Sequence, residues 1–350
     1  MNNNKKPIIL EYVWLDGNCE LRSKYRTVYT STENNAKLEV ESWNYDGSST
    51  YQAETENSEI VLNPIALYPN PFFPEAAAFL VLCDTYVSVS NNYSPTKSNH
   101  RVYALEQFNK RPELKPWYGI EQEYFMMAPN ETFDSSTPLA FSSGRMVPKA
   151  QGDYYCGVGN QHVQMRALAE KHYQYCLKAG LAISGINAEV APNQWEFQIG
   201  PCEGIEAGDQ LWIARYILHK LSEEYGINIS FKPKPISNPW NGSGLHTNFS
   251  TVETRSDGGI DKLLDYVRLL EPKHIEHIAV YGDNSARLSG QCETSDINTF
   301  SYGIGNRGCS IRIPNSVVKS KSGYLEDRRP ASNADPYEVI GILLKTCCLE

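Results

Sequence analysis

The pattern of hydrophobic residues changes near residue 91, and this change limits the possible folds more than any other feature of the sequence. Before it, strand-length apolar runs such as I-I-L-E-Y-V-W-L (from Ile8) and A-F-L-V-L-C-D-T-Y-V-S-V (from Ala78) are separated by turn signals. After it, short strand-like runs alternate with longer runs of helical periodicity. The sequence therefore predicts an α+β protein with a small β-rich amino-terminal domain and a larger α+β carboxy-terminal domain.

The polar segment N-N-Y-S-P-T-K-S-N, from Asn91 to Asn99, is expected to link the two domains, which we place at residues 7–91 and 98–350. Prolines at 64, 69, 71 and 74 are expected to prevent regular strand pairing there, because proline has no amide hydrogen to donate. Helices are expected after the linker at His100 to Lys110, Gln161 to Ala179, Gly208 to Tyr225, Gly259 to Leu270 and Tyr337 to Cys348.

The net charge of -9 argues against nucleic acid or an anionic membrane as the main partner, because such partners attract basic surfaces. No apolar run reaches the roughly 20 residues that span a bilayer, and the opening M-N-N-N-K-K-P lacks the apolar core of a secretory signal. The nine cysteines are scattered without a C-x-x-C pair, which indicates reduced thiols and no zinc site. We therefore expect a cytoplasmic protein.

Two glutamates in W-Y-G-I-E-Q-E-Y-F-M-M, Glu121 and Glu123, project from the same face if this segment is a strand. At about 7 Å apart, two ionised carboxylates repel by roughly 2 to 3 kcal/mol at an effective dielectric constant near 20. A positive group between them would remove that repulsion. The alternative is that both glutamates lie exposed on an edge strand.

A second candidate site lies in N-A-E-V-A-P-N-Q-W-E-F-Q-I-G-P. Trp195, Phe197 and Ile199 would form its buried face, which places Glu196 on the opposite face. Glu189 precedes a turn at Pro192, so the two carboxylates can approach each other. A solvated sheet face is the alternative.

Two later motifs carry further polar side chains. In P-W-N-G-S-G-L-H-T-N-F-S, two glycines allow a close backbone approach, and His246 shares strand parity with Asn248 and Ser250. In G-Y-L-E-D-R-R-P, Glu326 shares its face with Tyr324 and Arg328. A lone histidine is more often structural than metal-bound, and charged strand ends are usually exposed.

Carboxylates with one imidazole suit Mg²⁺ or Mn²⁺ better than zinc, and such ions often bridge phosphates. Arg287, Arg307, Arg312 and Arg328 could bind carboxylate or phosphate groups, although scattered arginines are also common on surfaces. Arg307 and Arg312 have opposite strand parity, so they can share a site only if the chain bends at Gly308. The sequence has no P-loop motif, and its one G-x-G-x-x-G, from Gly303, precedes a strand-like run and not a helix.

Taken in order along the chain, these motifs resemble glutamine synthetase of the eukaryotic type. The resemblance covers about Glu11 to Leu349 and rests on W-N-Y-D-G-S-S-T, Y-G-I-E-Q-E-Y, N-A-E-V-A-P-N-Q-W-E-F-Q-I-G-P-C-E-G-I, W-N-G-S-G-L-H-T-N-F-S, N-R-G-C-S-I-R-I-P and G-Y-L-E-D-R-R-P. It implies an amino-terminal β-grasp domain, a glutamine-synthetase catalytic domain, and a decamer of two pentameric rings with active sites between subunits. It also implies the reaction: L-glutamate, ATP and ammonia give L-glutamine, ADP and phosphate through γ-glutamyl phosphate.

The resemblance assigns residues to two Mg²⁺ or Mn²⁺ sites and three substrates. One ion would be held by Glu123, Glu189 and Glu196, and the other by Glu121, His246 and Glu326. Glutamate would be bound by Asn241, Gly242, Arg287, Arg307 and Arg328, and ammonium by Asp46, Ser49 and the flap residue Glu293. ATP would contact Trp117, Glu121, Glu196, Asn248, Phe249, Ser250, Tyr324, Arg307 and Arg312. Asp46, Glu293, Arg307 and Arg312 would act in catalysis.

The sequence departs from the usual pattern of the family in three places: Cys292 replaces a histidine, Gly308-Cys309 replaces a Ser-Ala pair, and the stretch from Asn160 to Arg166 is atypical. Two alternative functions remain open. A related ligase would attach an amine to glutamate. Asp46, which the resemblance assigns to ammonium, argues against it, because a bulky amine does not need an ammonium-sized anionic pocket. A catalytically inactive structural relative would be expected to have lost ligands, whereas all six metal-ligand positions are present.

Overall fold

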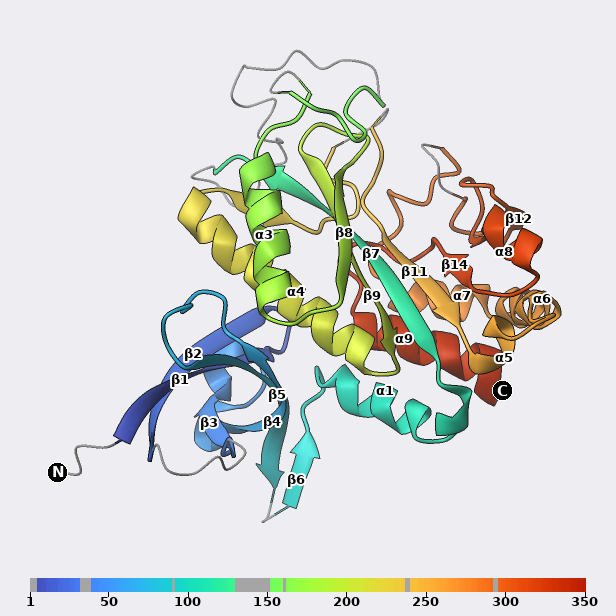
Figure 1. The fold of residues 1–350 in the computed structure, drawn as a ribbon. Helices are drawn as coiled ribbons and strands as arrows, with labels where there is room; N and C mark the ends of the chain where they lie inside the picture. The colour runs from blue at the N-terminus through green and yellow to red at the C-terminus, as the bar shows by residue number, and fades with distance from the viewer. Residues whose placement is uncertain are drawn as a thin grey trace. The chain divides into compact units, whose positions relative to one another are not determined.

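The computed structural model describes residues 5–31, 39–89, 92–129, 152–159, 162–236, 240–291 and 295–350. The chain divides into two compact units (Figure 1). The first contains residues 1–103 and 175–181, and the second contains residues 104–174 and 182–350. Each unit is built on its own β-sheet, and helices accompany the larger one, so the predicted α+β class is confirmed.

The amino-terminal sheet has six strands in the order β2-β1-β5-β4-β3, with β6 also paired to β5. Its two central strands β1 and β5 are parallel, as in a β-grasp domain, and the other pairs are antiparallel. The strands are β1 (Lys5–Leu15), β2 (Leu21–Ser31), β3 (Trp43–Asp46), β4 (Glu59–Pro69), β5 (Ala78–Val89) and β6 (Asn92–Pro95), with short 3₁₀ helices η1 (Gly47–Thr50) and η2 (Thr55–Asn57).

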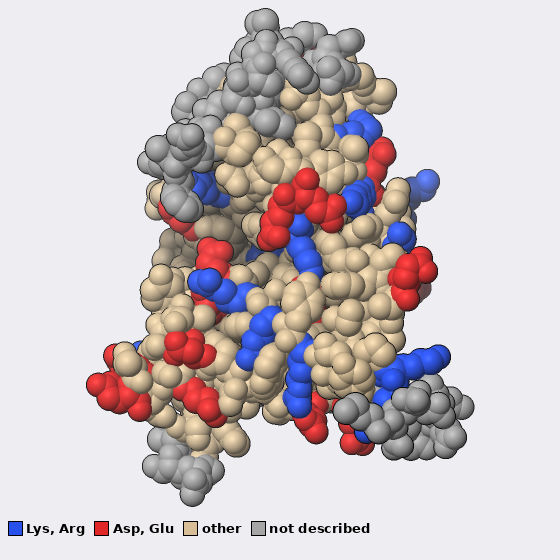
Figure 2. Space-filling model, turned by 90° about the vertical axis from the view of Figure 1, so that its left-hand side faces the viewer, with Lys and Arg blue, Asp and Glu red and all other residues tan. Residues whose placement is uncertain are grey.

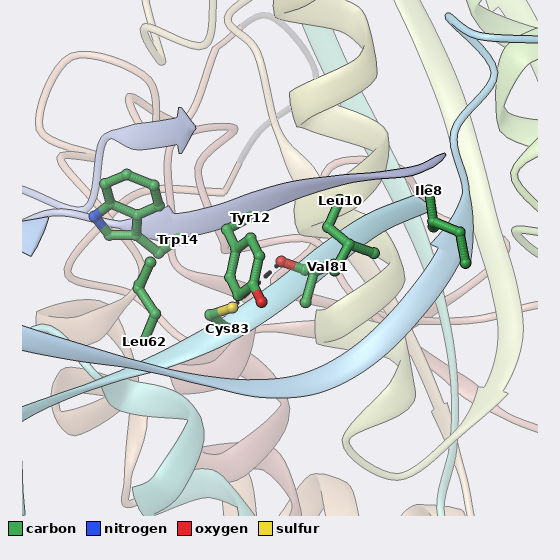
Figure 3. Packing of buried hydrophobic residues seen from close by; sticks show 7 residues of the cluster. All are labelled: Ile8, Leu10, Tyr12, Trp14, Leu62, Val81 and Cys83. Atoms are coloured by element: carbon green, nitrogen blue, oxygen red, sulfur yellow. Dashed lines mark hydrogen bonds between the residues drawn. The ribbon is translucent and has the colours of Figure 1, made fainter. Parts of the chain in front are cut away.

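Alternating residues of β1 form the hydrophobic core of this unit (Figure 3). Leu10, Tyr12 and Trp14 project to one side of the strand and pack with Leu62 of β4 and Val81 of β5. The other face of β1 is also buried, at Glu11 and Val13, so the apolar run that predicted a strand from Ile8 lies in the interior on both faces.

One expectation for this unit is wrong, and a second segment contains a strand that the sequence did not predict. Strand β4 passes through Pro64, because a register shift between Pro64 and Ala66 accommodates the missing amide hydrogen. The segment expected as a linker between Asn91 and Asn99 contains β6, which pairs with β5 from Tyr86 to Val89. A polar composition did not reveal this pairing, since the bonds of a strand ladder are made by the main chain.

The larger sheet has eight strands, in the order β12-β13-β14-β11-β7-β9-β8, with β10 also paired to β7. Its central strands β11, β7 and β9 are arranged with each neighbouring pair antiparallel (Figure 1). The strands are β7 (Trp117–Met127), β8 (Ile183–Ala188), β9 (Gln194–Glu203), β10 (Asn228–Ser230), β11 (Leu245–Ser250), β12 (Tyr302–Ile304), β13 (Ile311–Ile313) and β14 (Leu325–Asp327).

Helices α4 and α9 pack on the central strands of this sheet, with α4 against β7 and β9 and α9 against β11. Gly226 ends α4 in the left-handed conformation, and Asp335 caps α9. The helices are α1 (His100–Phe108), α3 (Arg166–Lys178), α4 (Glu206–Tyr225), α5 (Val252–Arg255), α6 (Ile260–Leu270), α7 (His274–Val280), α8 (Asn315–Ser320) and α9 (Pro336–Leu344), with the 3₁₀ turn η3 (Pro112–Leu114) and the π-helical turn η4 (Lys345–Leu349). All five expected helices are present, with ends shifted by up to five residues.

Acidic and basic side chains are mixed over the face of the molecule in Figure 2. Among the helices that the structure describes, none has the length and hydropathy needed to cross a membrane.

Candidate active site

Strand β7 carries the first two candidate carboxylates on one face. Its antiparallel registers place Glu121 opposite His246 of β11, and Glu123 opposite Glu196 of β9. Gln122 points to the other face, where it is fully buried and accepts a hydrogen bond of 2.8 Å from Nε of Arg215. The predicted strand parity is therefore correct, and the strand is central in its sheet, which excludes the edge-strand alternative.

Glu196 and Glu189 are buried, which excludes the solvated-face alternative. Burial and the neighbouring carboxylate of Glu123 raise the pKa of Glu189 to about 8. The pKa of Glu196 is raised well above its usual range, by burial first and then by Glu121, Glu123 and Glu189. So many acidic groups at low exposure are unfavourable unless a proton or a cation compensates them.

Fixed donors orient the Glu123 carboxylate. Its Oε2 accepts hydrogen bonds from Nε2 of Gln194 at 2.9 Å and from the main-chain amide of Gly244 at 3.0 Å. Gln194 also donates to the carbonyl of Gly242, so one amide side chain connects β9, β7 and the glycine segment. Gln194 has the same strand parity as Glu196, but parity gives no indication of this connecting role.

The imidazole of His246 faces three carboxylates. Its Nδ1 lies 3.5 Å from Glu121, 3.7 Å from Glu123 and 3.9 Å from Glu326. Burial, together with the charge of Arg328, lowers the pKa of His246 to about 3, so the ring is neutral at pH 7. A neutral imidazole among carboxylates fits a metal site, and His246 has acidic neighbours that an isolated structural histidine lacks.

Glu326 of β14 lies between two arginines. Its Oε1 is 2.6 Å from Arg328 and its Oε2 is 3.0 Å from Arg312. The carboxylate side chain is only 2% exposed, so its two interior partners are the arginine guanidinium groups. Asn248 lies opposite Glu326 in the β11–β14 register and donates to Glu121 at 2.9 Å.

The two glycines of the W-N-G-S-G motif make room for Arg287. A Cβ on Gly244 would lie 2.5 Å from Nη2 of Arg287, and one on Gly242 would lie 2.8 Å from its Cγ. Arg287 donates to the carbonyls of Arg328 and Arg329 at 3.0 and 3.1 Å. Sequence reasoning assigned the glycines to the approach of a ligand, and the structure adds the approach of a buried arginine.

A polar pocket of about 240 Å³ brings most of these groups together. It is lined by Glu121, Glu123, Tyr155, Glu189, Glu196, Asn241, Gly242, His246, Arg287, Arg307, Arg312 and Arg328. Arg307 and Arg312 both reach it, because Arg307 lies in the turn before β13 and so does not follow the strand parity of Arg312. Tyr155 was missed, since no motif surrounds it in the sequence.

A second, more apolar pocket of about 420 Å³ shares Glu121 with the first. Five residues of the ATP prediction line it: Trp117, Glu121, Asn248, Ser250 and Tyr324. Arg255, which sequence reasoning missed, also lines it and lies 4.0 Å from the centre of the Trp117 ring. Phe249 is fully buried against Tyr118 and Tyr266 and is not among the lining residues.

Asp46 and Ser49 lie in the amino-terminal unit, at the start of η1. The Asp46 carboxylate accepts hydrogen bonds from the hydroxyl groups of Ser48 at 2.7 Å and Ser49 at 2.6 Å. These hydroxyls lower the pKa of Asp46 to about 2, so this exposed carboxylate is ionised at pH 7. Cys292 and Glu293 lie outside the described residues, as do Asn160 and Gln161.

The donor set fits hard divalent cations. Ligand atoms of Glu121, Glu196 and His246 all lie within 4.8 Å of one another. Oxygen ligands with a single imidazole match the preferences of Mg²⁺ and Mn²⁺. Burial and the neighbouring carboxylates raise the pKa values of Glu189 and Glu196, and a bound cation would oppose both effects. The residues present therefore fit the two ions that the sequence resemblance implies.

Comparison with known proteins agrees with this geometry. The family model "Glutamine synthetase, catalytic domain" matches residues 101–259. The chain is 49% identical to glutamine synthetase of Emericella nidulans, over 97% of this chain and 92% of that protein. It is 50% identical to a putative glutamine synthetase of Acanthamoeba polyphaga mimivirus, over 99% and 96% of the two chains. The Saccharomyces cerevisiae glutamine synthetase is 49% identical, over 97% and 89%.

The solved structure "Apo GmaS without ligand" has the same fold, with a TM-score of 0.72 over 97% of this chain and 76% of that one. Its sequence is only 19% identical, so it supports the architecture alone. The relatives of about 49% identity extend over both units and over every motif of the site. The chain therefore belongs to the glutamine synthetase family.

Proposed function

We propose that this chain joins ammonia to the γ-carboxylate of L-glutamate at the expense of ATP, at the carboxylate cluster of the larger sheet. The observation that supports the proposal is one polar pocket that is lined by four glutamates, His246 and four arginines. A fifth glutamate, Glu326, lies beside His246 and Arg312. Such a cluster suits two divalent cations and an anionic substrate. The chain is thus a glutamate–ammonia ligase.

Two groups of residues would hold the cations. Glu123, Glu189 and Glu196 form one, and Glu121, His246 and Glu326 form the other. When bound, Mg²⁺ or Mn²⁺ would neutralise the ATP phosphates and make the terminal phosphorus more electrophilic. The closeness of Glu121, Glu196 and His246 suggests that the two groups adjoin.

The two pockets differ in polarity, and we assign ATP and glutamate to them on that basis. The apolar pocket, with Trp117 and Tyr324, would take the nucleotide, since an aromatic side chain can stack on a base. The polar pocket, with Asn241, Gly242, Arg287 and Arg328, would take glutamate through its carboxylates. Glu121 lines both pockets, so the terminal phosphate and the γ-carboxylate would meet near it.

The first step is attack of the γ-carboxylate oxygen on the terminal phosphoryl group of ATP, which releases ADP and forms γ-glutamyl phosphate. A free carboxylate is a poor electrophile, and the acyl phosphate gives it a leaving group. Arg307 and Arg312 would stabilise the negative charge of the transferring group. Both arginines line the polar pocket, and Nη1 of Arg312 lies 3.0 Å from Glu326.

In the second step, ammonia attacks the acyl phosphate and phosphate leaves. Ammonium has no lone pair, so a proton must first be removed from it. Asp46, ionised and held by Ser49, would bind ammonium and assist this removal. Glu293 would take part as the flap residue that closes over the intermediate and keeps water out.

We also propose the domain limits 7–91 and 98–350, a cytoplasmic location, and a decamer of two pentameric rings in which a neighbouring subunit supplies Asp46. The support is the sequence resemblance to the eukaryotic-type family, together with the location of Asp46 in a different unit from the carboxylate cluster. Sedimentation analysis tests the proposed assembly. A decamer should sediment as a particle with ten times the mass of one chain.

An assay of phosphate release tests the function. Purified protein is mixed with glutamate, ATP and Mg²⁺, and with either ammonium or a small primary amine. Release with ammonium, accompanied by formation of glutamine, supports the proposal. Release only with the amine would instead indicate a γ-glutamylamide ligase, and no release with either would indicate an inactive relative.

A further inference from the structure

The G-Y-L-E-D-R-R-P motif places one ion pair on each side of β14. Glu326 and Arg328 pair at 2.6 Å on the site face. Asp327 and Arg329 pair at 2.7 Å on the other face, and the side chains of both are fully buried. Neither Asp327 nor Arg329 lines either pocket, so the reaction does not account for the second pair.

The Asp327 carboxylate is held by four donors. It accepts hydrogen bonds from the main-chain amide of Arg329 at 3.0 Å, from Nε and Nη2 of Arg329 at 2.9 and 2.7 Å, and from the hydroxyl of Tyr281 at 2.8 Å. Because a buried charge without its partners is costly, these contacts allow the main chain at residues 327–329 little freedom.

His274 joins this pair to a second part of the chain. One ring nitrogen, Nε2, lies 2.8 Å from the carbonyl of Ile297, and Nδ1 lies 3.2 Å from Nη1 of Arg329. A carbonyl can only accept and a guanidinium can only donate, so His274 is the neutral tautomer protonated at Nε2. Burial also lowers its pKa, in agreement with a neutral ring. His274 therefore connects Arg329 to the main chain at Ile297.

The main chain between these contacts holds an arginine of the site. The carbonyl of Arg329 accepts from Nη1 of Arg287 at 3.1 Å and from Asn284 at 2.9 Å. The carbonyl of Arg328 accepts from Nη2 of Arg287 at 3.0 Å. A displacement of residues 328–329 would therefore move Arg287 as well as the side chain of Arg328 itself.

We propose that the back-face cluster, defined as Asp327, Arg329, Tyr281 and His274, positions Arg287 and Arg328 for glutamate and so determines the affinity for this substrate. Its members are positioning residues that do not touch glutamate. The inference rests on the proposed function, in which Arg287 and Arg328 bind glutamate.

The test uses small changes in the cluster. Tyr281→Phe removes one hydroxyl, and His274→Leu removes both ring nitrogens. The Tyr281 hydroxyl contacts both Asp327 and Nδ1 of His277, and the His274 ring contacts both Ile297 and Arg329. We expect each change to raise the KM for glutamate by about 3- to 10-fold, the order of the net loss of buried hydrogen bonds, while the KM for ATP changes by less than about twofold. His274→Gln retains an amide donor and acceptor and should recover part of the loss. The Tyr281→Phe measurement decides the test if His274→Leu does not fold.

His172→Phe is the matched control. His172 is also fully buried and bonds to a carbonyl, that of Ala214, but it lies on α3 and so outside the back-face cluster. It should lower the thermal midpoint to a similar extent without changing the KM for glutamate. Equal effects of Tyr281→Phe and His172→Phe on this KM would overturn the proposal, because they would indicate general destabilisation.

Arg287→Lys separates this inference from the proposed function. If it raises the KM for glutamate strongly while Tyr281→Phe and His274→Leu do not, the positioning role is wrong and the proposed function stands. If Arg287→Lys leaves this KM unchanged, Arg287 does not bind glutamate, and both the substrate assignment and the positioning role are overturned.

Discussion

Glu123 on β7 lies directly opposite Glu196 on β9, so two buried carboxylates face each other across adjacent strands of one sheet. Directly opposite like charges destabilise an antiparallel pair. The arrangement is understandable only if the cluster binds positive charge, and the proposed chemistry of the site follows from this point.

Glu123→Ala should abolish turnover, because one cation loses a ligand and Gln194 and Gly244 lose their acceptor. Cation binding by titration calorimetry should weaken by at least about tenfold, the order expected for a lost charged ligand. Glu170→Ala removes a half-exposed glutamate of α3 and is the control. Near-normal activity of Glu123→Ala would refute the metal assignment.

Asp46→Ala should raise the KM for ammonium by about 10- to 100-fold, which corresponds to the loss of one charged hydrogen-bonding partner. The KM for glutamate should remain close to that of the unmodified protein. Asp283→Ala is a matched control, since Asp283 is also exposed, ionised and bonded to the serine two positions later. An unchanged dependence on ammonium in Asp46→Ala would exclude its proposed role.

Gly244→Ala should raise the KM for glutamate, because the added Cβ would lie 2.5 Å from the Arg287 guanidinium and displace it. A loss of about 1 to 3 kcal/mol in stability is also expected from overpacking. Gly341→Ala is the control, since its Cβ would meet Ala104 at 3.4 Å, which is close to an ordinary contact. If Gly244→Ala and Gly341→Ala have the same KM for glutamate, the absence of a side chain at Gly244 is not what allows Arg287 to take its position.

Acid should destabilise the protein partly through His172. Burial lowers the pKa of His172 to about 4, below the usual 6.5, so the unfolded state binds this proton more strongly than the folded state. The stability from the neutral ring is fully present above pH 6.5 and is lost as the pH falls towards 4, at up to about 1.4 kcal/mol per pH unit. Unfolding by denaturant should show this slope, and His172→Phe should reduce it. Identical slopes would show that His172 is not the group responsible.

The sequence predicted the carboxylate positions well, because strand parity is local. Glu121, Glu123 and Glu196 occupy the faces expected from their apolar neighbours. The alternation of Glu326 and Arg328 is also as expected, and it leaves Asp327 and Arg329 for the opposite face. These features need only a period of two.

What the sequence could not predict depends on contacts between distant segments. Tyr155 and Arg255 line the pockets through loop and helix positions that no period identifies. Arg307 joins Arg312 through a turn, which parity had left unexplained. The space that Gly242 and Gly244 leave for Arg287 depends on a segment more than forty residues away.

Anomalous diffraction from crystals soaked in Mn²⁺ tests the central claim most directly. We predict Mn²⁺ peaks within the polar pocket, at one group formed by Glu123, Glu189 and Glu196 and at another formed by Glu121, His246 and Glu326. Mn²⁺ bound only at other surfaces of a well-ordered protein, with this pocket free of anomalous density, would contradict the claim.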